Sequence, residues 1–400
     1  MRLSAHGDLT GLLETCQVCA RLSPMSKRRR SSPSRRTTTS LAASIGILLC
    51  IALIYGAQQL FGGLLGSADT LTPAVESAPT DGSWVQLYFT EPRNPDDKSN
   101  RPEESVDDYV VASIQSAKRT VDAVSYEFNL PTMAEVLIDA HNRGLIVRLV
   151  TDTDSMGEEA VQEIIDAGVP VVEDDRSAIM HDKFVIVDGT TLWTGSWNFT
   201  ENDTYRNNNN LLAVASSRLV ANYQTEFNEM FERSEFGPKS AANTPYPQVT
   251  VDGVLVENYF SSEDGVAQHI LDALDNASQS IYFAAFTFTR DDFSQVLVEK
   301  ANAGVAVRGV YETRQVNAGS DESYNLLSGA GLQVLLDGNQ YTMHHKFFVI
   351  DNQIVVTGSY NFTKAAEDSN DENVLIIHSP EIAQAYLQEF AKVWLQAGGN

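Results

Sequence analysis

The feature that most constrains the fold of this chain is an internal repeat. Residues 180–200 (MHDKFVIVDGTTLWTGSWNFT) match residues 343–363 (MHHKFFVIDNQIVVTGSYNFT) at 11 of 21 positions without a gap. Each copy ends a pattern of strand, helix, strand, helix and strand, and a helical stripe of aromatic residues follows each copy. The duplication predicts an α/β chain made of two similar halves, each a sheet covered by helices.

A stretch rich in Gly, Pro and Ser, Gly237–Pro247, separates the two halves. The sequence therefore predicts five segments in chain order. They are a basic cytoplasmic segment (1–40), a signal anchor or signal peptide (41–66), a linker (67–84), the first half (85–236) and the second half (248–400).

An apolar run, Leu41–Tyr55, follows a basic stretch that is rich in Ser and Thr. This order is typical of a membrane-targeting segment, and its length fits both an anchor and a signal peptide cleaved near Gly66–Ala68. Basic residues before the run favour a cytoplasmic N-terminus. We therefore expect an extracytoplasmic body that is either anchored in the membrane by residues 41–66 or secreted after cleavage.

The charge beyond residue 66 restricts the partners of that body. It has 20 basic and 51 acidic residues, which is a formal charge of −31. An acidic surface repels polyanions at long range, which argues against binding nucleic acid through a broad basic face. A small basic pocket is compatible with this charge. All three cysteines, Cys16, Cys19 and Cys50, precede the body, so the sequence predicts no disulfide within it.

The two copies of the repeat carry the same set of polar residues. The set is His181, Lys183, Asp188, Ser196 and Asn198 in the first copy and His344, Lys346, Asp351, Ser359 and Asn361 in the second. Alternation along a strand places the His and the Lys of each copy on one face. If the halves pack around a pseudo-twofold axis, two His and two Lys meet in one cleft.

This set of side chains suits phosphoryl transfer. One imidazole can attack phosphorus while the other protonates the leaving alcohol and then activates water. The lysines, with the Ser and Asn side chains as further donors, would bind the phosphate oxygens. Asp188 and Asp351 close their strands before turn sequences, which fits a structural role at least as well as a chemical one.

The motif HxKxxxxD followed by GSxN, intact in both copies, resembles the signature of the phospholipase D superfamily. The resemblance covers roughly Val85–Gln396. It implies two similar αβα-sandwich halves in a pseudo-twofold arrangement, a phosphohistidine intermediate, and no metal or other cofactor. It also implies a monomer, since one chain holds both motifs.

The two copies differ at one position that the resemblance makes important. Glu372 stands where members of the superfamily have a catalytic carboxylate that orients the motif histidine, whereas the matching residue of the first half is Asn209. We therefore expect Glu372 to support His344, and we expect His181 to lack such support. The resemblance further implies that His181 is the nucleophile.

The substrate is open between two classes of phosphodiester. Residues 343–377 are similar to the small bacterial nuclease of the superfamily, which favours DNA or RNA as substrate. The membrane-directed segment, the acidic body and the lack of an Arg/Lys stripe favour phospholipid cleavage, with a zwitterionic headgroup such as that of phosphatidylcholine.

We expect a phospholipase D-type lipid hydrolase, with a secreted, metal-independent endonuclease as the alternative. A non-catalytic binding module is a remote third hypothesis, because such a module usually lacks a motif His or Lys and this chain retains all four. The loop Arg93–Glu104 has no counterpart in the second half, so we expect it to influence specificity.

Overall fold

The computed structural model describes residues 74–76, 83–93, 102, 104–319 and 322–399. The predicted segments 1–40 and 41–66 lie outside these ranges, so the anchor or signal peptide stays a prediction. Among the described residues, no helix is both long enough and apolar enough to cross a membrane.

The first half forms a seven-stranded sheet in the order β2-β8-β7-β6-β3-β4-β5. Its strands are β2 (Val85–Phe89), β3 (Thr120–Ser125), β4 (Ile146–Thr151), β5 (Val171–Glu173), β6 (Lys183–Val187), β7 (Thr191–Gly195) and β8 (Asn210–Val214). Its helices are α2 (Val106–Ser116), α3 (Pro131–Asn142), η2 (Thr153–Ser155), α4 (Glu159–Asp166), α5 (Glu201–Tyr205) and α6 (Ser217–Arg233). Strands β3, β4 and β5 are parallel, and the remaining pairs are antiparallel.

The second half repeats this plan in a nine-stranded sheet, β1-β9-β10-β16-β15-β14-β11-β12-β13. Its own strands are β9 (Gln248–Val251), β10 (Val254–Ser261), β11 (Ser280–Ala285), β12 (Ala306–Tyr311), β13 (Gln333–Leu336), β14 (Lys346–Ile350), β15 (Ile354–Gly358) and β16 (Glu372–His378). Its helices are α7 (Val266–Asp275), α8 (Asp291–Asn302), α9 (Thr313–Asn317), α10 (Glu322–Gly329), α11 (Lys364–Asp368) and α12 (Pro380–Gln396), and η3 (Gly237–Lys239) lies between the halves.

Part of the expected linker, where the structure describes it, forms a strand. Ala74–Glu76 forms β1, which pairs in parallel with β9 at the edge of the second sheet. Trp84, also within the expected linker, is buried in the core. The pairing of β1 and the burial of Trp84 therefore attach these two parts of the expected linker to the folded body.

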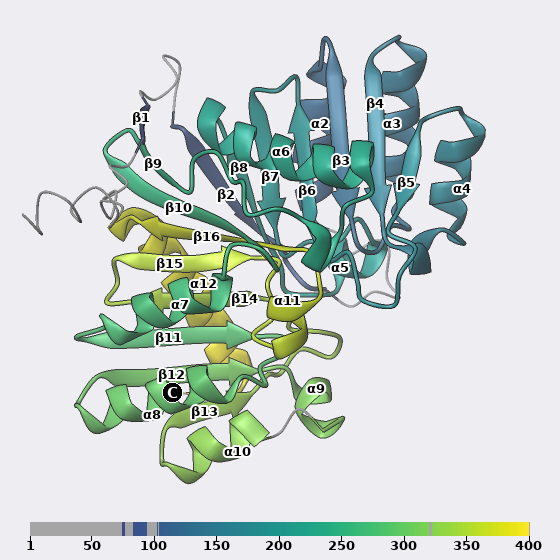
Figure 1. Cartoon of the computed structure of the whole chain (residues 1–400). Helices are drawn as coiled ribbons and strands as arrows, with labels where there is room; N and C mark the ends of the chain where they lie inside the picture. Colours follow the sequence, from purple (N-terminus) through teal and green to yellow (C-terminus); the bar gives the residue numbers. More distant parts are fainter. Residues whose placement is uncertain (1–73, 77–82, 94–101, 103, 320–321, 400) are drawn as a thin grey trace, which may run out of the picture. The chain divides into compact units, whose positions relative to one another are not determined.

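Each sheet has helices on both faces, as the two-half α/β prediction requires. Helices α2, α3 and α4 cover the outer face of the first sheet, and α7, α8 and α10 cover the outer face of the second. The inner faces share one core that contains the aromatic stripes of α6 and α12, including Tyr223, Phe227, Tyr386 and Phe390. Figure 1 shows the first half in blue and teal and the second in green and yellow. The prediction of two αβα sandwiches in one chain is confirmed.

Candidate active site

The side chains of the two motif pairs are buried where the halves meet. His181 and His344 are 3% and 6% exposed, and Lys183 and Lys346 are each 1% exposed. Lys183 begins β6 and Lys346 begins β14, so each histidine lies just before the strand that its lysine opens. Each lysine ammonium donates a hydrogen bond to the backbone carbonyl of the histidine two residues before it, which fixes the geometry of the pair.

Backbone hydrogen bonds join the segment before each motif strand to the opposite half. The His181 N–H donates to the carbonyl of Asp371, just before β16, at 2.9 Å. The His344 N–H donates to the carbonyl of Asn208, two residues before β8, at 3.0 Å. In each half, the segment that leads into the last strand therefore binds the backbone of the motif histidine in the other half.

As a result, Glu372 contacts the histidine of the first half. Its Oε2 lies 2.7 Å from Nδ1 of His181. The expectation that Glu372 supports His344, and that His181 lacks a carboxylate, is therefore wrong. Aligning the repeats identifies equivalent positions correctly, but the pseudo-twofold axis places each such position beside the motif of the opposite half.

His344 has a different partner, the amide of Asn209. Its Nδ1 lies 2.9 Å from Oδ1 of Asn209, and Ser196 Oγ donates to the same oxygen at 2.8 Å. Nδ2 of Asn209 donates to the backbone carbonyl of Asp203 at 3.1 Å, which assigns the amide oxygen to the side that faces the imidazole. Nδ1 of His344 therefore carries a proton, and Nε2 is its free nitrogen.

The four basic side chains influence one another electrostatically, so they share one site. Burial, together with Lys183, Lys346 and His344, lowers the pKa of His181 well below its usual value. Burial and the two lysines do the same to the pKa of His344. Burial also lowers the pKa of Lys183 to about 8 and lowers that of Lys346 well below its usual value. This excess of positive charge is what an anionic phosphodiester would balance.

The Gly and Ser of each GSxN segment support the residues that hold the histidines. A Cβ atom on Gly195 or Gly358 would collide with the backbone of the neighbouring strand, β8 or β16, so the close approach needs glycine. Ser196 donates to the amide described above, and the Ser359 hydroxyl accepts from the backbone N–H of Asn373, the residue next to Glu372. Both hydroxyls are thus engaged by protein groups, which differs from the phosphate contact expected for them.

The side-chain amides of the two motif asparagines, Asn198 and Asn361, are buried. Within the described ranges, Oδ1 of Asn198 and Oδ1 of Asn361 have no hydrogen-bond partner. The amide N–H groups and the lysine ammoniums are donors that suit a phosphate. Among the described residues, no group of three or more His, Cys, Asp or Glu side chains is placed to hold a metal ion.

Asp188 and Asp351 lie at the far ends of the motif strands and bind backbone. Asp188 accepts hydrogen bonds from the N–H groups of residues 118–120, and Asp351 from those of residues 278–280, at 2.7–3.1 Å. Each carboxylate thereby anchors the turn that leads into β3 or β11. Both residues adopt positive φ angles, 55° and 52°, which Asp tolerates better than most residues.

Two aromatic residues that the sequence analysis missed pack against the motif pairs. The ring of Tyr126 lies 5.1 Å from that of His181, and the ring of Phe286 lies 4.7 Å from that of His344. Each ring also lies under the lysine ammonium of the same pair, at 5.4 Å and 4.8 Å. The signal was present in the sequence, because both aromatics directly follow matching strands, β3 and β11.

Behind the first motif lies a group of buried carboxyl side chains. Burial raises the pKa of Asp182 to about 6, and Nδ2 of Asn373 donates to its Oδ1 at 2.6 Å. Glu226 and Glu263 act electrostatically on each other. Burial raises the pKa of Glu263 to about 8 and raises that of Glu226 well above its usual value. This carboxyl pair therefore holds a proton at neutral pH.

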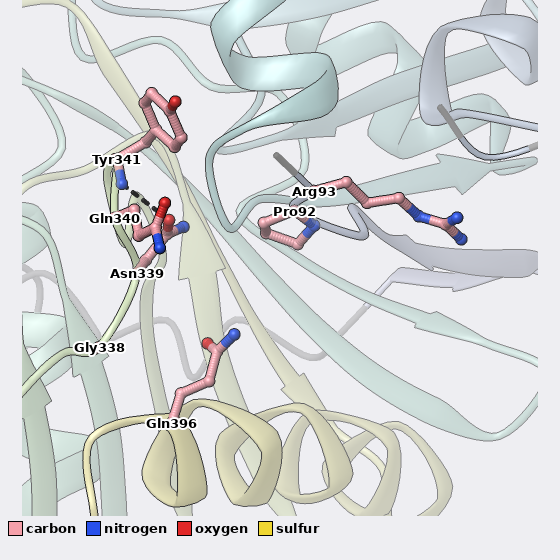
Figure 2. A pocket seen from close by; sticks show the side chains of 7 residues that line it. All are labelled: Pro92, Arg93, Gly338, Asn339, Gln340, Tyr341 and Gln396. Atoms are coloured by element: carbon pink, nitrogen blue, oxygen red, sulfur yellow. Dashed lines mark hydrogen bonds between the residues drawn. The ribbon is translucent and has the colours of Figure 1, made fainter. Parts of the chain in front are cut away.

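A separate cavity of about 290 Å³ lies beside the loop that leads to His344. Figure 2 shows its lining residues, with Asn339, Gln340 and Tyr341 on one side, Pro92 and Arg93 on the other, and Gln396 below them. Asn339 Nδ2 donates to Oδ1 of Asn208, the residue whose carbonyl binds the His344 backbone. The cavity contains no motif residue, and Arg93 places it at the root of the loop Arg93–Glu104, most of which lies outside the described ranges.

Comparison with known proteins identifies relatives of both halves. A family model described as "Cardiolipin synthase, PLD-like domain" matches residues 110–231 and 270–394. The mitochondrial cardiolipin hydrolase of Chlamydomonas reinhardtii is similar to this chain, with 37% identity over 125 residues that cover 31% of the chain and 55% of the relative. A phospholipase D of Rickettsia bellii is 28% identical over 181 residues, which cover 45% of the chain and 89% of the relative. The chain thus spans little more than half the length of the cardiolipin hydrolase.

A solved structure extends the comparison to the whole fold. Phosphatidylserine synthase from Haemophilus influenzae superposes with a TM-score of 0.55 at 14% identity, covering 72% of this chain and 84% of that one. This likeness shows a common fold. Because the family model matches more than half of the chain, in two places that correspond to the two halves, the chain belongs to the phospholipase D-like family and contains its domain twice.

Proposed function

We propose that this chain is a phospholipase D-type phosphodiesterase that hydrolyses phospholipids through a phosphohistidine intermediate on His181. One observation supports the proposal above all others. Two motif histidines, each held at Nδ1 by a residue of the opposite half, share one buried site with two lysines. That arrangement leaves Nε2 of each ring for chemistry and provides cations for the phosphate.

The roles of the two histidines follow from their partners. Nε2 of His181 attacks phosphorus, and the bond to the leaving alcohol breaks while His344 donates a proton to that oxygen. The phosphorylated ring of His181 is cationic, so direct contact with the Glu372 carboxylate stabilises it. His344, now neutral, takes a proton from water. The resulting hydroxide attacks phosphorus, breaks the P–N bond and releases the phosphomonoester.

A phospholipid is favoured by the charge around the site. Glu127 acts electrostatically on both Lys183 and Lys346, so a carboxylate lies near the place where the phosphate binds. It attracts a cationic headgroup and repels the additional phosphates of a polyanion. The relatives named cardiolipin hydrolase and phospholipase D support lipid as the substrate class. In this proposal, residues 41–66 place the body at a membrane.

Nucleic acid is the alternative substrate, because the resemblance of residues 343–377 to the small nuclease of the superfamily favours it. Two intact and converging His/Lys pairs argue against a non-catalytic binding module.

The test is an assay of the full chain in excess EDTA on phosphatidylcholine vesicles, phosphatidylglycerol vesicles and single-stranded DNA. His181→Ala and His344→Ala are the matched controls, with circular dichroism as the check of folding. We expect turnover of phosphatidylcholine that both substitutions abolish. DNA cleavage with the same losses would assign the nuclease instead. Activity that EDTA removes, or that survives both substitutions, would refute the two-histidine mechanism.

A further inference from the structure

The carboxylate of Asp203 lies beside the second motif histidine. Its Oδ2 is 3.4 Å from Nδ1 of His344, and its side chain is 3% exposed. The position is fixed from several sides. Oδ2 accepts from the N–H of Asn198 at 2.8 Å, Oδ1 accepts from the amide of Asn207 at 2.5 Å, and Thr200 caps the helix through the Asp203 N–H. Asp203 is therefore a buried, firmly held charge that faces the site.

The repeat places no carboxylate at the matching position of the second half. Asp203 lies on α5, and the residue at the same offset on α11 is Ala366. The situation on the last strand is reversed, because the first half has Asn209 where the second half has Glu372. Each half thus supplies one carboxylate to the opposite histidine, but from a different element.

Asn209 orients the ring of His344, but its neutral amide supplies no charge. Its amide oxygen accepts the Nδ1 proton, yet an amide does little to stabilise the protonated ring. Burial lowers the pKa of His344 most, and the charged and titratable groups Lys346, Lys183 and His345 act in the same direction. Among the described residues, Asp203 is the carboxylate within ion-pair distance of this ring.

We propose that Asp203 is the carboxylate partner of His344, and that it stabilises the protonated form in which this histidine acts as general acid. This inference rests on the proposed function. Asp203 acts through His344 and is therefore a positioning residue. The longer distance suits its task, because His344 must both give and take a proton, whereas the ring of His181 is cationic for as long as it carries the phosphoryl group on Nε2 and Nδ1 stays protonated.

The first test compares leaving groups in the full chain. Asp203→Asn retains a carbonyl for the N–H of Asn198 but removes the charge. With phosphatidylcholine, we expect kcat/KM about tenfold lower and the basic limb of its pH profile about one unit lower, because each unit of pKa changes the protonated fraction tenfold. With p-nitrophenyl phosphorylcholine, whose leaving group needs no proton, we expect the burst of p-nitrophenol to be nearly unchanged.

Rescue and control variants complete the test. Asp203→Asn combined with Asn209→Asp returns a carboxylate to His344 at the position equivalent to Glu372, and we expect the basic limb to return toward that of the parent. Asp368→Asn, the same change on the matching helix α11, should leave both substrates and the pH profile unaffected. Equal loss on both substrates with an unmoved basic limb would overturn the proposal, because that is the result of a purely structural role.

A readout that does not need turnover separates this inference from the proposed function. In protein labelled with ¹⁵N at its seven histidines, the His344 resonance is assigned from a His344→Asn sample and titrated. We expect Asp203→Asn to lower the pKa of His344 and to leave that of His181 unchanged. An unchanged His344 titration would refute the role of Asp203 even if phospholipid turnover is observed, and the expected shift would support it even if the substrate proves to be DNA.

Discussion

Glu372 of the second half lies 2.7 Å from Nδ1 of His181 in the first half. We expect Glu372→Gln to lower kcat about 10²- to 10⁴-fold, because an amide in place of an orienting carboxylate can stabilise the wrong tautomer of the ring. Steady-state kinetics on phosphatidylcholine measure the loss. Glu389→Gln is the matched control, since Glu389 also contacts a buried histidine, His345, outside the motif pairs. A similar loss of kcat in both variants would contradict the assignment.

Removing the general acid should trap the covalent intermediate. We expect His344→Ala to release one equivalent of p-nitrophenol from p-nitrophenyl phosphorylcholine and then to stall, because no base remains to activate water. Acid-labile phosphate on His181, detected by mass spectrometry of a peptide, identifies the intermediate. His181→Ala should give neither burst nor label. Label on residue 344 in that variant would reverse the two roles.

The lowered pKa of Lys183 gives the activity a dependence on pH. Because burial holds this pKa at about 8, the ammonium loses its charge as the pH rises through that value, and kcat/KM should fall a second time there, above the basic limb that His344 sets. Lys183→Arg keeps its charge far beyond this range, so we expect a weaker fall between pH 8 and about 9.5. An identical fall near pH 8 in the Arg variant would show that a group other than Lys183 causes this second fall.

The carboxyl pair behind the site makes stability depend on pH in the opposite sense to an ordinary carboxylate. The pKa of Glu263 is raised to about 8 in the folded protein, so the folded state binds more protons than the unfolded state between the two pKa values. The free energy of unfolding should therefore fall as the pH rises from about 5 to 8. Glu263→Gln should flatten this part of the Tm profile, and an unaltered slope would contradict the raised pKa of Glu263.

The motif aspartates should matter for stability and not for chemistry. Asp351 accepts hydrogen bonds from three consecutive backbone N–H groups at the entry to β11. We expect Asp351→Ala to lower the free energy of unfolding by about 2 kcal/mol, since it leaves those donors without an acceptor. Urea denaturation measures this loss. At a temperature where the variant is folded, kcat/KM should equal that of the parent, and a large fall would give Asp351 a chemical role.

Much of the fold could be predicted from the sequence, because the repeat shows that the two halves have the same order of elements. Matching runs of residues predict matching strands, and two intact motifs predict a common site at the junction. The repeat could not show which half each supporting residue faces. Glu372 was paired with the wrong histidine for this reason. The contact between His181 of the first half and Asp371 of the second depends on how the two sheets pack.

Asp203 was missed for a different physical reason. The repeat highlights residues that recur, and the matching position holds Ala366, so nothing marked this carboxylate among the many of an acidic chain. Its position depends on the short helix α5 and its capping residue Thr200, whose geometry is visible only in three dimensions. Tyr126 and Phe286 could have been found, because both are aromatic and recur at equivalent places.

The exchange of supporting residues between the halves has a consequence for how such a site can diverge. In an assembly of two identical chains, a change in one supporting residue would alter both histidines at once. Here a duplication within a single gene encodes each support separately, so Asn209 and Glu372 can differ while the two histidines stay the same. Under the proposed mechanism, two equivalent histidines can thereby take different tasks, one forming a covalent bond and the other moving a proton.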